Sequence, residues 1–344
     1  MTQKILSWYS QHKRDLPWRN TLNPYKIWVS EIILQQTQIK TGAKYYHLFI
    51  EKFPNVESLS NASDIDILNI WQGLGYYNRA LNMLVSAKIV MTHYKGVFPS
   101  KYNDLLQLKG VGAYTAAAIS SICTDEKKAV VDGNVYRFLS RFYNIDTPIN
   151  TSSGKKEFQN IADQLIPNKK SGTYNQAIMD FGSLQCKKNN PKCNICPFKS
   201  KCKAFVLGTV HLRPVKNKHM ISKIRYFNYL LIKNNNHFIV QQRGINDIWK
   251  KLYEMPLIES NTGLTKSKIT KHKYVQSFNI KDIKLRCSMT HKLSHQKLKI
   301  LFWDLNTEKL NCYKKFQQIS MDEISQYPFP SPLKKYFDKE HLSI

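Results

Sequence analysis

The chain has 344 residues, which is long enough for two domains that each bury a core of their own. Its 52 Lys and Arg residues outnumber 24 Asp and Glu residues, and the formal charge of +28 favours a polyanionic partner, although a Lys-rich composition alone could also produce it. The sequence starts without a secretory apolar segment and contains no run near the roughly 20 apolar residues of a transmembrane helix, so we expect a cytoplasmic protein with no membrane partner.

Residues 1–203 have the apolar spacing of helices. Apolar side chains recur at intervals of three and four in 66–94 and again in 133–143. Gly and Pro residues separate these segments, and no alternation typical of strands is present. We therefore predict an all-helical first domain.

A carboxylate stands in an apolar segment at 24–39. Glu31 follows Trp28 and precedes Ile32, and a polar run at 35–38 comes directly after. A carboxyl group in such surroundings would be partly desolvated, which raises its pKa and keeps a proton available near neutral pH. The alternative interpretation is a solvated residue followed by an ordinary polar helix end.

Two glycines punctuate the segment 105–119. Gly110 and Gly112 flank Val111, an arrangement that permits a tight turn between helices and a close backbone approach to a ligand. Amide groups at the start of the following helix can bind a phosphate, which suits contact with a DNA backbone that is independent of sequence. A simple turn between two helices is the alternative.

Asp132 stands directly before Gly133 and Asn134 and a helical run. Asp is a favourable N-cap residue, and that structural role could be its whole function. An Asp held at a helix start also stays ionised, which is what stabilisation of a developing cation requires. The two interpretations are compatible.

Four cysteines crowd into residues 186–202. Their spacing, C-x6-C-x2-C-x5-C, suits either an iron–sulfur cluster or a tetrahedral zinc ion, because a reducing compartment disfavours disulfides. We expect the neighbouring lysines to lower the pKa values of the thiols, and metal binding to fold a loop that has no core of its own. The four ligands would be Cys186, Cys193, Cys196 and Cys202.

The sequence changes character after the cysteines. Residues 204–223 are basic and have no clear period, so we interpret them as a linker. Beyond them, alternating segments predict strands, two of which flank the turn sequence KNNN at 233–236 as a hairpin. Ser320 and Glu323 have the spacing of a capping box before a short helix. The second domain is predicted to be α+β.

Several independent motifs together resemble a known family. "LKGVGAYTAAA", "VDGNVYRF" and the cysteine cluster are similar to the helix-hairpin-helix DNA glycosylases that carry an iron–sulfur cluster; "LPWR", "WVSEIILQQTQ", "GLGYYNRA" and "NQAIMDFGSLQC" resemble the adenine DNA glycosylase (MutY) type among them. The resemblance implies a multi-domain protein with one 4Fe-4S cluster. Its parts would be an all-α glycosylase domain at 1–203 with the helix-hairpin-helix near 105–119 and the cluster loop at 186–202, a linker at 204–223, and an α+β Nudix-like lesion-recognition domain at 224–344.

The resemblance also implies a reaction. The substrate would be adenine paired with 8-oxoguanine or guanine in duplex DNA, flipped out of the stack at a cost of a few kcal/mol. Glu31 matches the acid that protonates N7 of the base, and Asp132 matches the carboxylate that stabilises the oxocarbenium-like sugar. Tyr114 and Asn134 match positions near the sugar and the aspartate.

Further matches concern contacts with DNA. Arg19 and Leu34 match the adenine pocket, whereas Gln36 and Thr37 match residues that enter the duplex. Tyr77 matches an aromatic wedge between bases, although packing in the core is the commoner fate of such a side chain.

Position 114 bears on strand cleavage. Relatives that also cut the strand carry a Lys where this chain has Tyr114, and that Lys forms a Schiff base with the sugar. We therefore expect base removal without efficient strand cleavage, with at most weak lyase activity from a nearby lysine such as Lys109.

The second domain resembles the Nudix-like domain of the same family more loosely. "DIWKKLYEMPLIE" at 247–259 is similar to a family segment, but the Glu-rich Nudix signature is absent, so we expect recognition rather than magnesium-dependent hydrolysis. Ser294 and His295 match a loop that reads 8-oxoguanine, and Leu293 replaces the usual Phe there. A polar turn between two strands is the alternative.

Three rival functions are a bifunctional pyrimidine-lesion glycosylase and lyase, a non-catalytic DNA-binding protein with a cluster, and a Nudix hydrolase. Tyr114 and the second domain argue against the first, the presence of both Glu31 and Asp132 against the second, and the missing signature against the third. We expect a monomer that binds double-stranded DNA and is associated with the nucleoid through it.

Overall fold

The computed structural model describes residues 1–217, 223–310 and 316–339. The chain forms two compact units: Met1–Asn61 together with Asn82–Lys218, and Ala62–Leu81 together with His219–Ile344. Among the described helices, none combines the length and the hydropathy required to cross a membrane.

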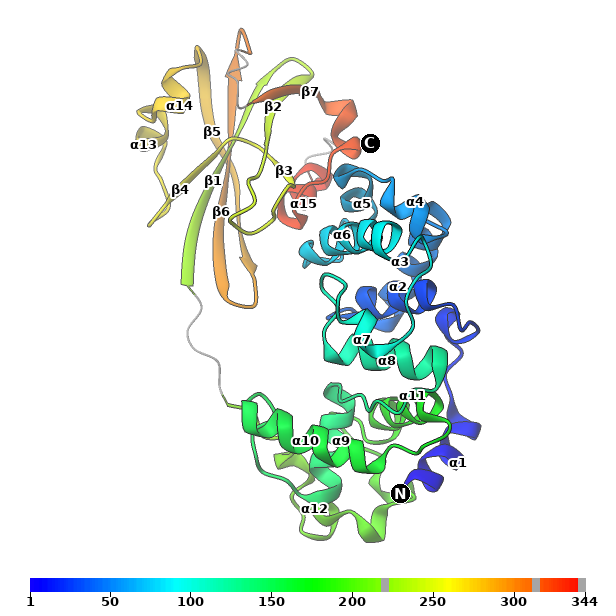
Figure 1. Cartoon of the computed structure of the whole chain (residues 1–344). Helices are drawn as coiled ribbons and strands as arrows, with labels where there is room; N and C mark the ends of the chain where they lie inside the picture. The colour runs from blue at the N-terminus through cyan, green and yellow to red at the C-terminus, as the bar shows by residue number, and fades with distance from the viewer. Residues whose placement is uncertain (218–222, 311–315, 340–344) are drawn as a thin grey trace. The chain divides into compact units, whose positions relative to one another are not determined.

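The first unit is helical, as predicted (Figure 1). Short 3-10 turns and one π-helical turn, η2, join its α-helices. The elements are α1 Thr2–His12, η1 Pro17–Arg19, α2 Pro24–Leu34, α3 Ile39–Lys52, α4 Val56–Ser60, α6 Asn78–His93 (which begins in the second unit), α7 Tyr102–Leu105, α8 Ala113–Thr124, α9 Gly133–Tyr143, α10 Ser152–Leu165, α11 Ser171–Asp180, η2 Phe181–Gln185, η3 Cys193–Ile195, η4 Lys199–Lys201, α12 Lys203–Val206 and η5 Val210–Leu212.

Local sequence determines where the helices that matter most begin. Asn23 caps α2, because its side chain accepts a hydrogen bond from the Lys26 amide at 3.2 Å, and Pro24 occupies the first helical position. Asp132 caps α9 in the same way. These caps place the side chains of Glu31 and Asp132 at fixed points on neighbouring elements.

An aromatic cluster forms the core beneath α9 and the cysteine loop. Phe181 contacts Phe138 edge-on at a centroid distance of 4.9 Å and Phe198 at 5.4 Å, and Trp8 of α1 packs against Phe181 at 5.0 Å. All four side chains are buried. Edge-to-face pairs of this kind contribute beyond their buried area, so this core ties α1, α9, η2 and the cysteine loop together.

The second unit contains a mixed seven-stranded sheet, which confirms the predicted α+β class. The main strand order is β3-β2-β1-β6-β5, with β1 and β6 parallel and β5 and β6 antiparallel. The strands are β1 Lys223–Asn234, β2 His237–Gln242, β3 Tyr253–Glu254, β4 Leu257–Ser260, β5 Ile280–Lys292, β6 Gln296–Thr307 and β7 Gln317–Ser320. The predicted β1–β2 hairpin is confirmed, with Asn234 paired to His237.

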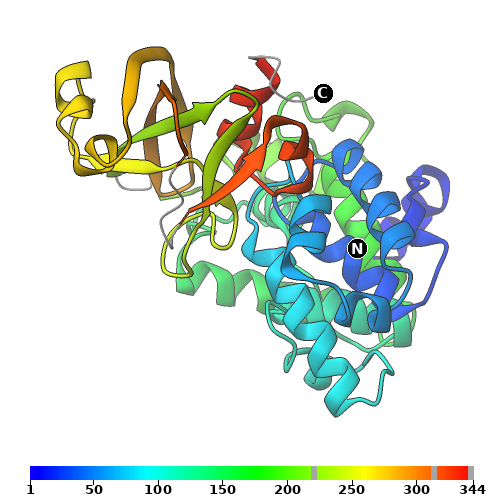
Figure 2. The same cartoon turned by 90° about the horizontal axis from the view of Figure 1, so that it is seen from above.

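Short helices cover the two faces of this sheet. On one face, Ile269 of α13 Lys266–Thr270 and Val275 of α14 Lys273–Gln276 pack in a cluster with Leu230. On the other face, Tyr336 of α15 Ser331–Lys339 stacks on Phe302 at a centroid distance of 4.2 Å. Figure 2 shows α15, in red, beside the strands. The predicted capping box at Ser320 and Glu323 is present and starts the 3-10 helix η6 Met321–Gln326.

Two predicted boundaries differ from the structure. The segment expected to be a linker from residue 204 begins instead with α12 and η5, because buried Arg141 donates hydrogen bonds to the carbonyls of Val210 and Arg213, and the Ile149 amide donates to Val215. The first unit therefore extends further than predicted, and residues 218–222 of the expected linker lie outside the described residues. The second difference is that 62–81, with α5 Asp64–Ile70, groups with the second unit.

Candidate active site

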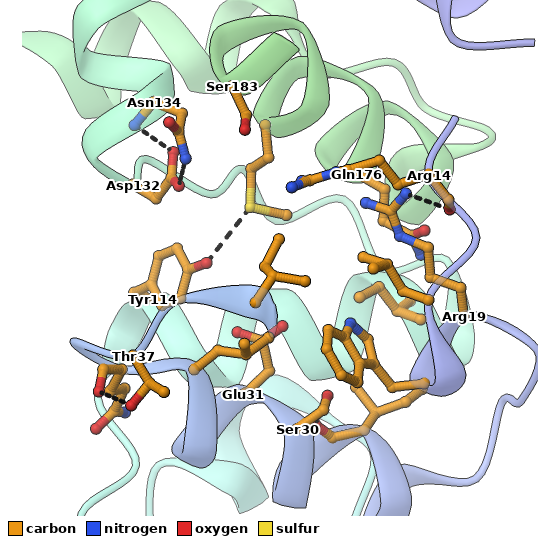
Figure 3. A pocket seen from close by; sticks show the side chains of 18 of the residues that line it. Arg14, Arg19, Ser30, Glu31, Thr37, Tyr114, Asp132, Asn134, Gln176 and Ser183 are labelled. Carbon is orange, nitrogen blue, oxygen red and sulfur yellow. Dashed lines mark hydrogen bonds between the residues drawn. The ribbon is translucent and has the colours of Figure 1, made fainter. Parts of the chain in front are cut away.

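A cavity of about 400 Å³ opens in the first unit between α2, α8, the start of α9 and α11 (Figure 3). This volume lies in the range of pockets that hold small ligands. The cavity brings together predicted site residues from distant parts of the sequence: Arg19, Glu31, Leu34, Gln36, Thr37, Tyr114, Asp132 and Asn134.

Glu31 projects from α2 into this cavity (Figure 3). Burial and, to a smaller extent, the negative charge of Asp132 raise the pKa of its carboxyl to about 7, although Arg19 and a hydrogen bond with Tyr114 act to lower it. A carboxyl group with that pKa is a proton donor at neutral pH. The structure therefore supports the predicted desolvation of Glu31.

Asp132 holds its place through three N–H donors. Its Oδ1 accepts hydrogen bonds from the amides of Asn134 at 2.9 Å and Val135 at 2.8 Å, and its Oδ2 accepts from the Asn134 side chain at 2.7 Å. Burial raises the pKa of Asp132, against the expectation of a freely ionised cap, while these hydrogen bonds lower it. Because every donor is an N–H group, the arrangement favours the carboxylate form over the protonated one.

A line of hydrogen bonds runs from Asp132 to the cysteine loop. Asn134 accepts from Arg137 Nη2 at 2.9 Å, and Arg137 Nε donates to the carbonyl of Cys186 at 2.7 Å. Gly182 of η2 lies against the same helix start, since a Cβ there would approach the Asn134 carbonyl oxygen to 2.5 Å. The position of Asn134 thus depends on both α9 and the π-helical turn.

Tyr114 occupies the wall of the cavity on α8. Its hydroxyl donates to Met179 Sδ at 3.4 Å, and burial raises the pKa of the phenol well above its ordinary value. The described residues that line the cavity include no Lys. Position 114 itself carries a phenol and no amine.

Sequence reasoning missed the partner that holds Arg19. Buried Asp180 of α11 accepts from Arg19 Nη1 at 2.7 Å and Nη2 at 2.8 Å, and from Arg14 Nε at 2.8 Å. These bonds lower the pKa of Asp180 despite its burial. Gln176, one turn earlier in α11, also lines the cavity and accepts from the Tyr9 hydroxyl at 3.0 Å. The only signal for both residues was their presence in the segment "NQAIMDFGSLQC".

The end of α2 has an unusual backbone. Gln36 has a φ of 62°, in the left-handed region that non-glycine residues seldom occupy. Its neighbour Gln35 donates from Nε2 to Thr115 Oγ1 at 3.3 Å, which fixes the turn against α8. Gln36 and Thr37 consequently lie at the cavity lining, and their entry into a duplex stays a prediction.

The prediction that Tyr77 enters the duplex is wrong, because this side chain is buried. Tyr77 is 5% exposed, and its hydroxyl lies 3.5 Å from Ser331 Oγ, so its ring is not available to enter a duplex. The adjacent Tyr76 is 53% exposed and has a φ of 50°. Two consecutive tyrosines of one motif therefore have opposite environments, and Tyr76 is the accessible aromatic.

The glycine hairpin joins α7 and α8. Gly110 has a φ of 80°, and a Cβ there would lie 2.9 Å from the Asn82 side chain, so both the conformation and the space require glycine. Gly112 precedes α8 without any side-chain cap, which leaves amides at the helix start unsatisfied by a side chain. Val111 is buried, so its side chain is unavailable to DNA and only backbone groups of this turn could bind it.

Ser294 and His295 lie at the exposed tip of the β5–β6 hairpin. Ser294 Oγ lies 3.2 Å from His295 Nδ1, and the Leu293 amide donates to the Gln296 carbonyl at 2.8 Å to close the turn. Both side chains are accessible to a partner. This geometry is compatible with the predicted readout and with a simple polar turn.

The four cysteines line one cavity with Phe138, Arg141 and Phe198. Arg141 Nη1 lies 3.5 Å from Cys186 Sγ and also donates to the Lys187 carbonyl at 2.7 Å, so a buried cation organises the loop. Burial raises the pKa values of Cys193, Cys196 and Cys202, and Cys196 reaches about 11. The expectation that local lysines would lower these pKa values is therefore wrong for the loop as described.

The donor set, four thiols, suits an iron–sulfur cluster or a tetrahedral zinc ion. Four thiols converge on a single cavity beside a buried guanidinium, which would offset the negative charge of a thiolate cluster. Across the described residues, no group of three or more His, Cys, Asp or Glu side chains is already arranged around a metal position, so the identity of the bound group stays a prediction.

Comparisons with known proteins agree with this geometry. Residues 29–167 match the family described as HhH-GPD superfamily base excision DNA repair protein, and residues 228–339 match the NUDIX domain. The chain is 40% identical over 304 residues to the adenine DNA glycosylase of Buchnera aphidicola subsp. Baizongia pistaciae (strain Bp), which covers 87% of this chain and 84% of that protein.

A second relative and a solved structure extend the similarity. The adenine DNA glycosylase of Buchnera aphidicola subsp. Schizaphis graminum (strain Sg) is 36% identical over 324 residues, which cover 92% of this chain and 89% of that protein. The structure of a thermostable thymine-DNA glycosylase is similar with a TM-score of 0.56 at 30% identity, covering 60% of this chain and 95% of that one.

Proposed function

The chain belongs to the adenine DNA glycosylase family of the HhH-GPD superfamily, and from this premise we propose that it removes adenine paired with 8-oxoguanine or guanine from duplex DNA. The observation that carries the proposal is the pair of carboxyl groups, Glu31 and Asp132, in one cavity of about 400 Å³. Adenine is a poor leaving group, so excision needs both a proton for the base and a negative charge for the sugar.

Glu31 is the proposed general acid. Its pKa of about 7 leaves a large fraction protonated at neutral pH, and its side chain faces the cavity that would hold the flipped base. Transfer of its proton to N7 of adenine lets the base leave as a neutral molecule. Acids placed in this way contribute roughly 10²–10⁴-fold in rate.

Asp132 is the proposed stabiliser of the sugar cation. Loss of the base leaves positive charge on C1′ and the ring oxygen, and a carboxylate held by three N–H donors supplies a fixed negative charge without reorganisation. Asn134 positions that carboxylate through its amide nitrogen. Water then adds to C1′ and the product is an abasic site.

We further propose that the enzyme does not cleave the strand efficiently. Tyr114 stands where an amine would be needed, and its phenol stays protonated because burial raises its pKa. Such a group can donate a hydrogen bond but cannot form an imine with the sugar.

The cysteine loop is proposed to hold one 4Fe-4S cluster on Cys186, Cys193, Cys196 and Cys202. When bound, the cluster would cross-link a loop that otherwise depends on the Arg141 contacts and the aromatic core. Support comes from the shared cavity of the four thiols. Hydrogen bonds link the Cys186 carbonyl through Arg137 to Asn134, so the loop would help to position the residue that holds Asp132.

Three surfaces are proposed to contact DNA. The hairpin at Gly110 and Gly112 would bind backbone phosphates, Gln36 and Thr37 with Tyr76 would enter the duplex, and Ser294 with His295 at the tip of the Nudix-like domain would contact 8-oxoguanine. The accessibility of these polar and aromatic groups supports the assignment. Neutralising six or more phosphates would make binding weaken by about 10³-fold between 50 and 200 mM salt.

Chromatographic detection of the free base tests the proposal. Duplexes carrying one adenine opposite 8-oxoguanine, guanine or thymine are incubated with excess enzyme, and released adenine is measured against time. We expect rapid release opposite 8-oxoguanine, slower release opposite guanine and almost none opposite thymine. Release that ignores the opposite base, or no release by protein with its full metal content, would contradict it.

A further inference from the structure

The loop Trp71–Tyr77, here called the wedge loop, has a constrained backbone. Gly73, Gly75 and Tyr76 have φ angles of 99°, 72° and 50°, so three of its residues occupy the left-handed region. Trp71 Nε1 and Arg79 Nη2 both donate to the Gly75 carbonyl at 3.1 Å. A tyrosine with this φ is strained and persists only where surrounding contacts hold it.

Stacking orients the ring of Tyr76. The Arg79 guanidinium lies 5.1 Å from the Trp71 ring and 5.8 Å from the Tyr76 ring, while 53% of Tyr76 remains exposed. The loop therefore presents one aromatic side chain outward from a fixed base. Its neighbour Tyr77 is buried.

The C-terminal stretch 327–334, here called the clamp, holds the wedge loop within the second unit. Lys334 Nζ donates to Gln72 Oε1 at 2.8 Å, and Ser331 Oγ lies 3.5 Å from the Tyr77 hydroxyl. Gln72 Nε2 reaches the carbonyl oxygens of Tyr327 and Phe329, both at 3.5 Å. The clamp thus contacts residues on both sides of the strained Gly73–Tyr76 turn.

The same unit also anchors the helix that leads into the wedge loop. Asn69 Nδ2 of α5 donates to the Gln326 carbonyl at 2.8 Å, and Asp64 at the start of α5 forms a salt bridge with Lys251. The C-terminal part of the chain consequently holds both α5, which leads into the wedge loop, and the wedge loop itself. None of these contacts involves Ser294 or His295.

We propose that the clamp positions Tyr76 for entry into the duplex, so that the Nudix-like domain assists base flipping whatever base lies opposite the adenine. The proposal rests on the proposed function of Tyr76 as the aromatic that enters the stack. Ordering a loop costs conformational entropy, and the clamp orders this loop before DNA binds. Gln72, Tyr77, Ser331 and Lys334 are positioning residues in this account.

The Nudix-like domain would then make two separate contributions to excision. The hairpin tip at Ser294 would alter the ratio of rates opposite 8-oxoguanine and guanine, because it contacts the opposite base. The clamp would change both rates by the same factor, because the wedge acts on the stack rather than on a particular partner.

The test compares the double variant Ser331→Ala with Lys334→Ala against wild type in the full-length chain. Base flipping is followed by the fluorescence of 2-aminopurine in place of adenine, and excision is followed by single-turnover rates on both duplexes. We expect reductions of about 2- to 30-fold in flipping and in both excision rates, with their ratio unchanged. The single variant Lys334→Arg keeps a donor for Gln72 and should lose much less than the single variant Lys334→Ala.

A matched control and a double-mutant cycle make the test decisive. Lys281→Ala removes an exposed lysine that pairs with Glu308 at 2.7 Å in the same unit and has no hydrogen bond to the clamp among the described contacts, and it should leave flipping unchanged. Tyr76→Ala should reduce flipping by itself, and the clamp variant should add little in that background. Fully additive losses would overturn the inference, because the clamp would then act independently of Tyr76.

The variants distinguish failure of the proposed DNA contact of Tyr76 from failure of the positioning role of the clamp. If Tyr76→Ala leaves flipping and excision at wild-type levels, the proposed DNA contact of Tyr76 is wrong and the inference falls with it. If Tyr76→Ala is impaired while the clamp variant behaves as wild type, the proposed function stands and the positioning role is wrong.

Discussion

The cavity of the helical unit and the tip of the β5–β6 hairpin carry the proposed chemistry in opposite ways. In the cavity, Asp132 accepts three hydrogen bonds, and the Asp180 carboxylate accepts two from the Arg19 guanidinium. At the tip, Ser294 and His295 are exposed and lie against each other. Groups that stabilise a transition state must be oriented in advance, whereas groups that read a base can remain accessible until it arrives.

Removing the proposed acid, Glu31, should have the largest effect on the rate of adenine release. Glu31→Gln keeps the shape of the side chain but offers no ionisable proton, so we expect the single-turnover rate of adenine release to fall by roughly 10²–10⁴-fold. Affinity for the duplex should change little. Glu57→Gln, at an exposed position of α4, is the control. A wild-type rate for Glu31→Gln would remove the basis of the mechanism.

Disturbing the packing around Asn134, which holds Asp132, should have the second-largest effect on the rate. Gly182→Ala places a Cβ within 2.5 Å of the Asn134 carbonyl, so the start of α9 must shift. Misplacement by about 1 Å can cost roughly 10²-fold in rate, and we expect a loss of that order in single-turnover excision. Gly244→Ala, where a Cβ meets nothing within 4 Å, should behave as wild type. Equal rates for both variants would show that Asn134 does not depend on this packing.

The pH dependence should show the protonated acid directly. With a pKa of about 7, Glu31 is protonated below that pH and loses its proton above it. The single-turnover rate should therefore be highest below about pH 7 and fall by about tenfold per pH unit above it. Duplex affinity measured over the same range is the control. A rate that rises through pH 7 would mean that the essential form of the carboxyl is the ionised one.

Changing the tip of the β5–β6 hairpin should have the smallest effect on the rate, and the effect should depend on the base opposite the adenine. Ser294→Ala removes one hydrogen-bonding group from an exposed turn, and we expect a loss of a few-fold, in line with roughly 0.5–1.5 kcal/mol for one hydrogen bond. The loss should appear opposite 8-oxoguanine and be absent opposite guanine. Ser288→Ala, on β5 of the same hairpin, is the control. Equal losses on both duplexes would assign Ser294 a structural role only.

Sequence alone predicted the parts of the site whose chemistry restricts the residue type. The surroundings of Glu31, the cap at Asp132, the glycine turn and the four cysteines are local patterns, and the structure brings each to the expected element. The fold class of both domains was also predictable, because the spacing of apolar residues is likewise a local pattern.

The missing parts depend on contacts between distant residues. Arg19 and Asp180 are 161 positions apart, and no local pattern indicates that they form a buried pair. Tyr76 and Tyr77 are chemically identical, so only the left-handed backbone of the loop decides which ring is exposed. The segment 204–217 has no clear period and folds because Arg141 supplies donors to its carbonyls.

The central claim is excision of adenine without strand cleavage, and one gel tests it. A labelled duplex with a single adenine opposite 8-oxoguanine is incubated with the enzyme, and half of the sample is then heated in alkali. The account predicts a break at the adenine only in the alkali-treated half, because an abasic site is alkali-labile and Tyr114 cannot form an imine. Equal breakage in both halves would contradict the role assigned to Tyr114, and no breakage in either would contradict adenine excision itself.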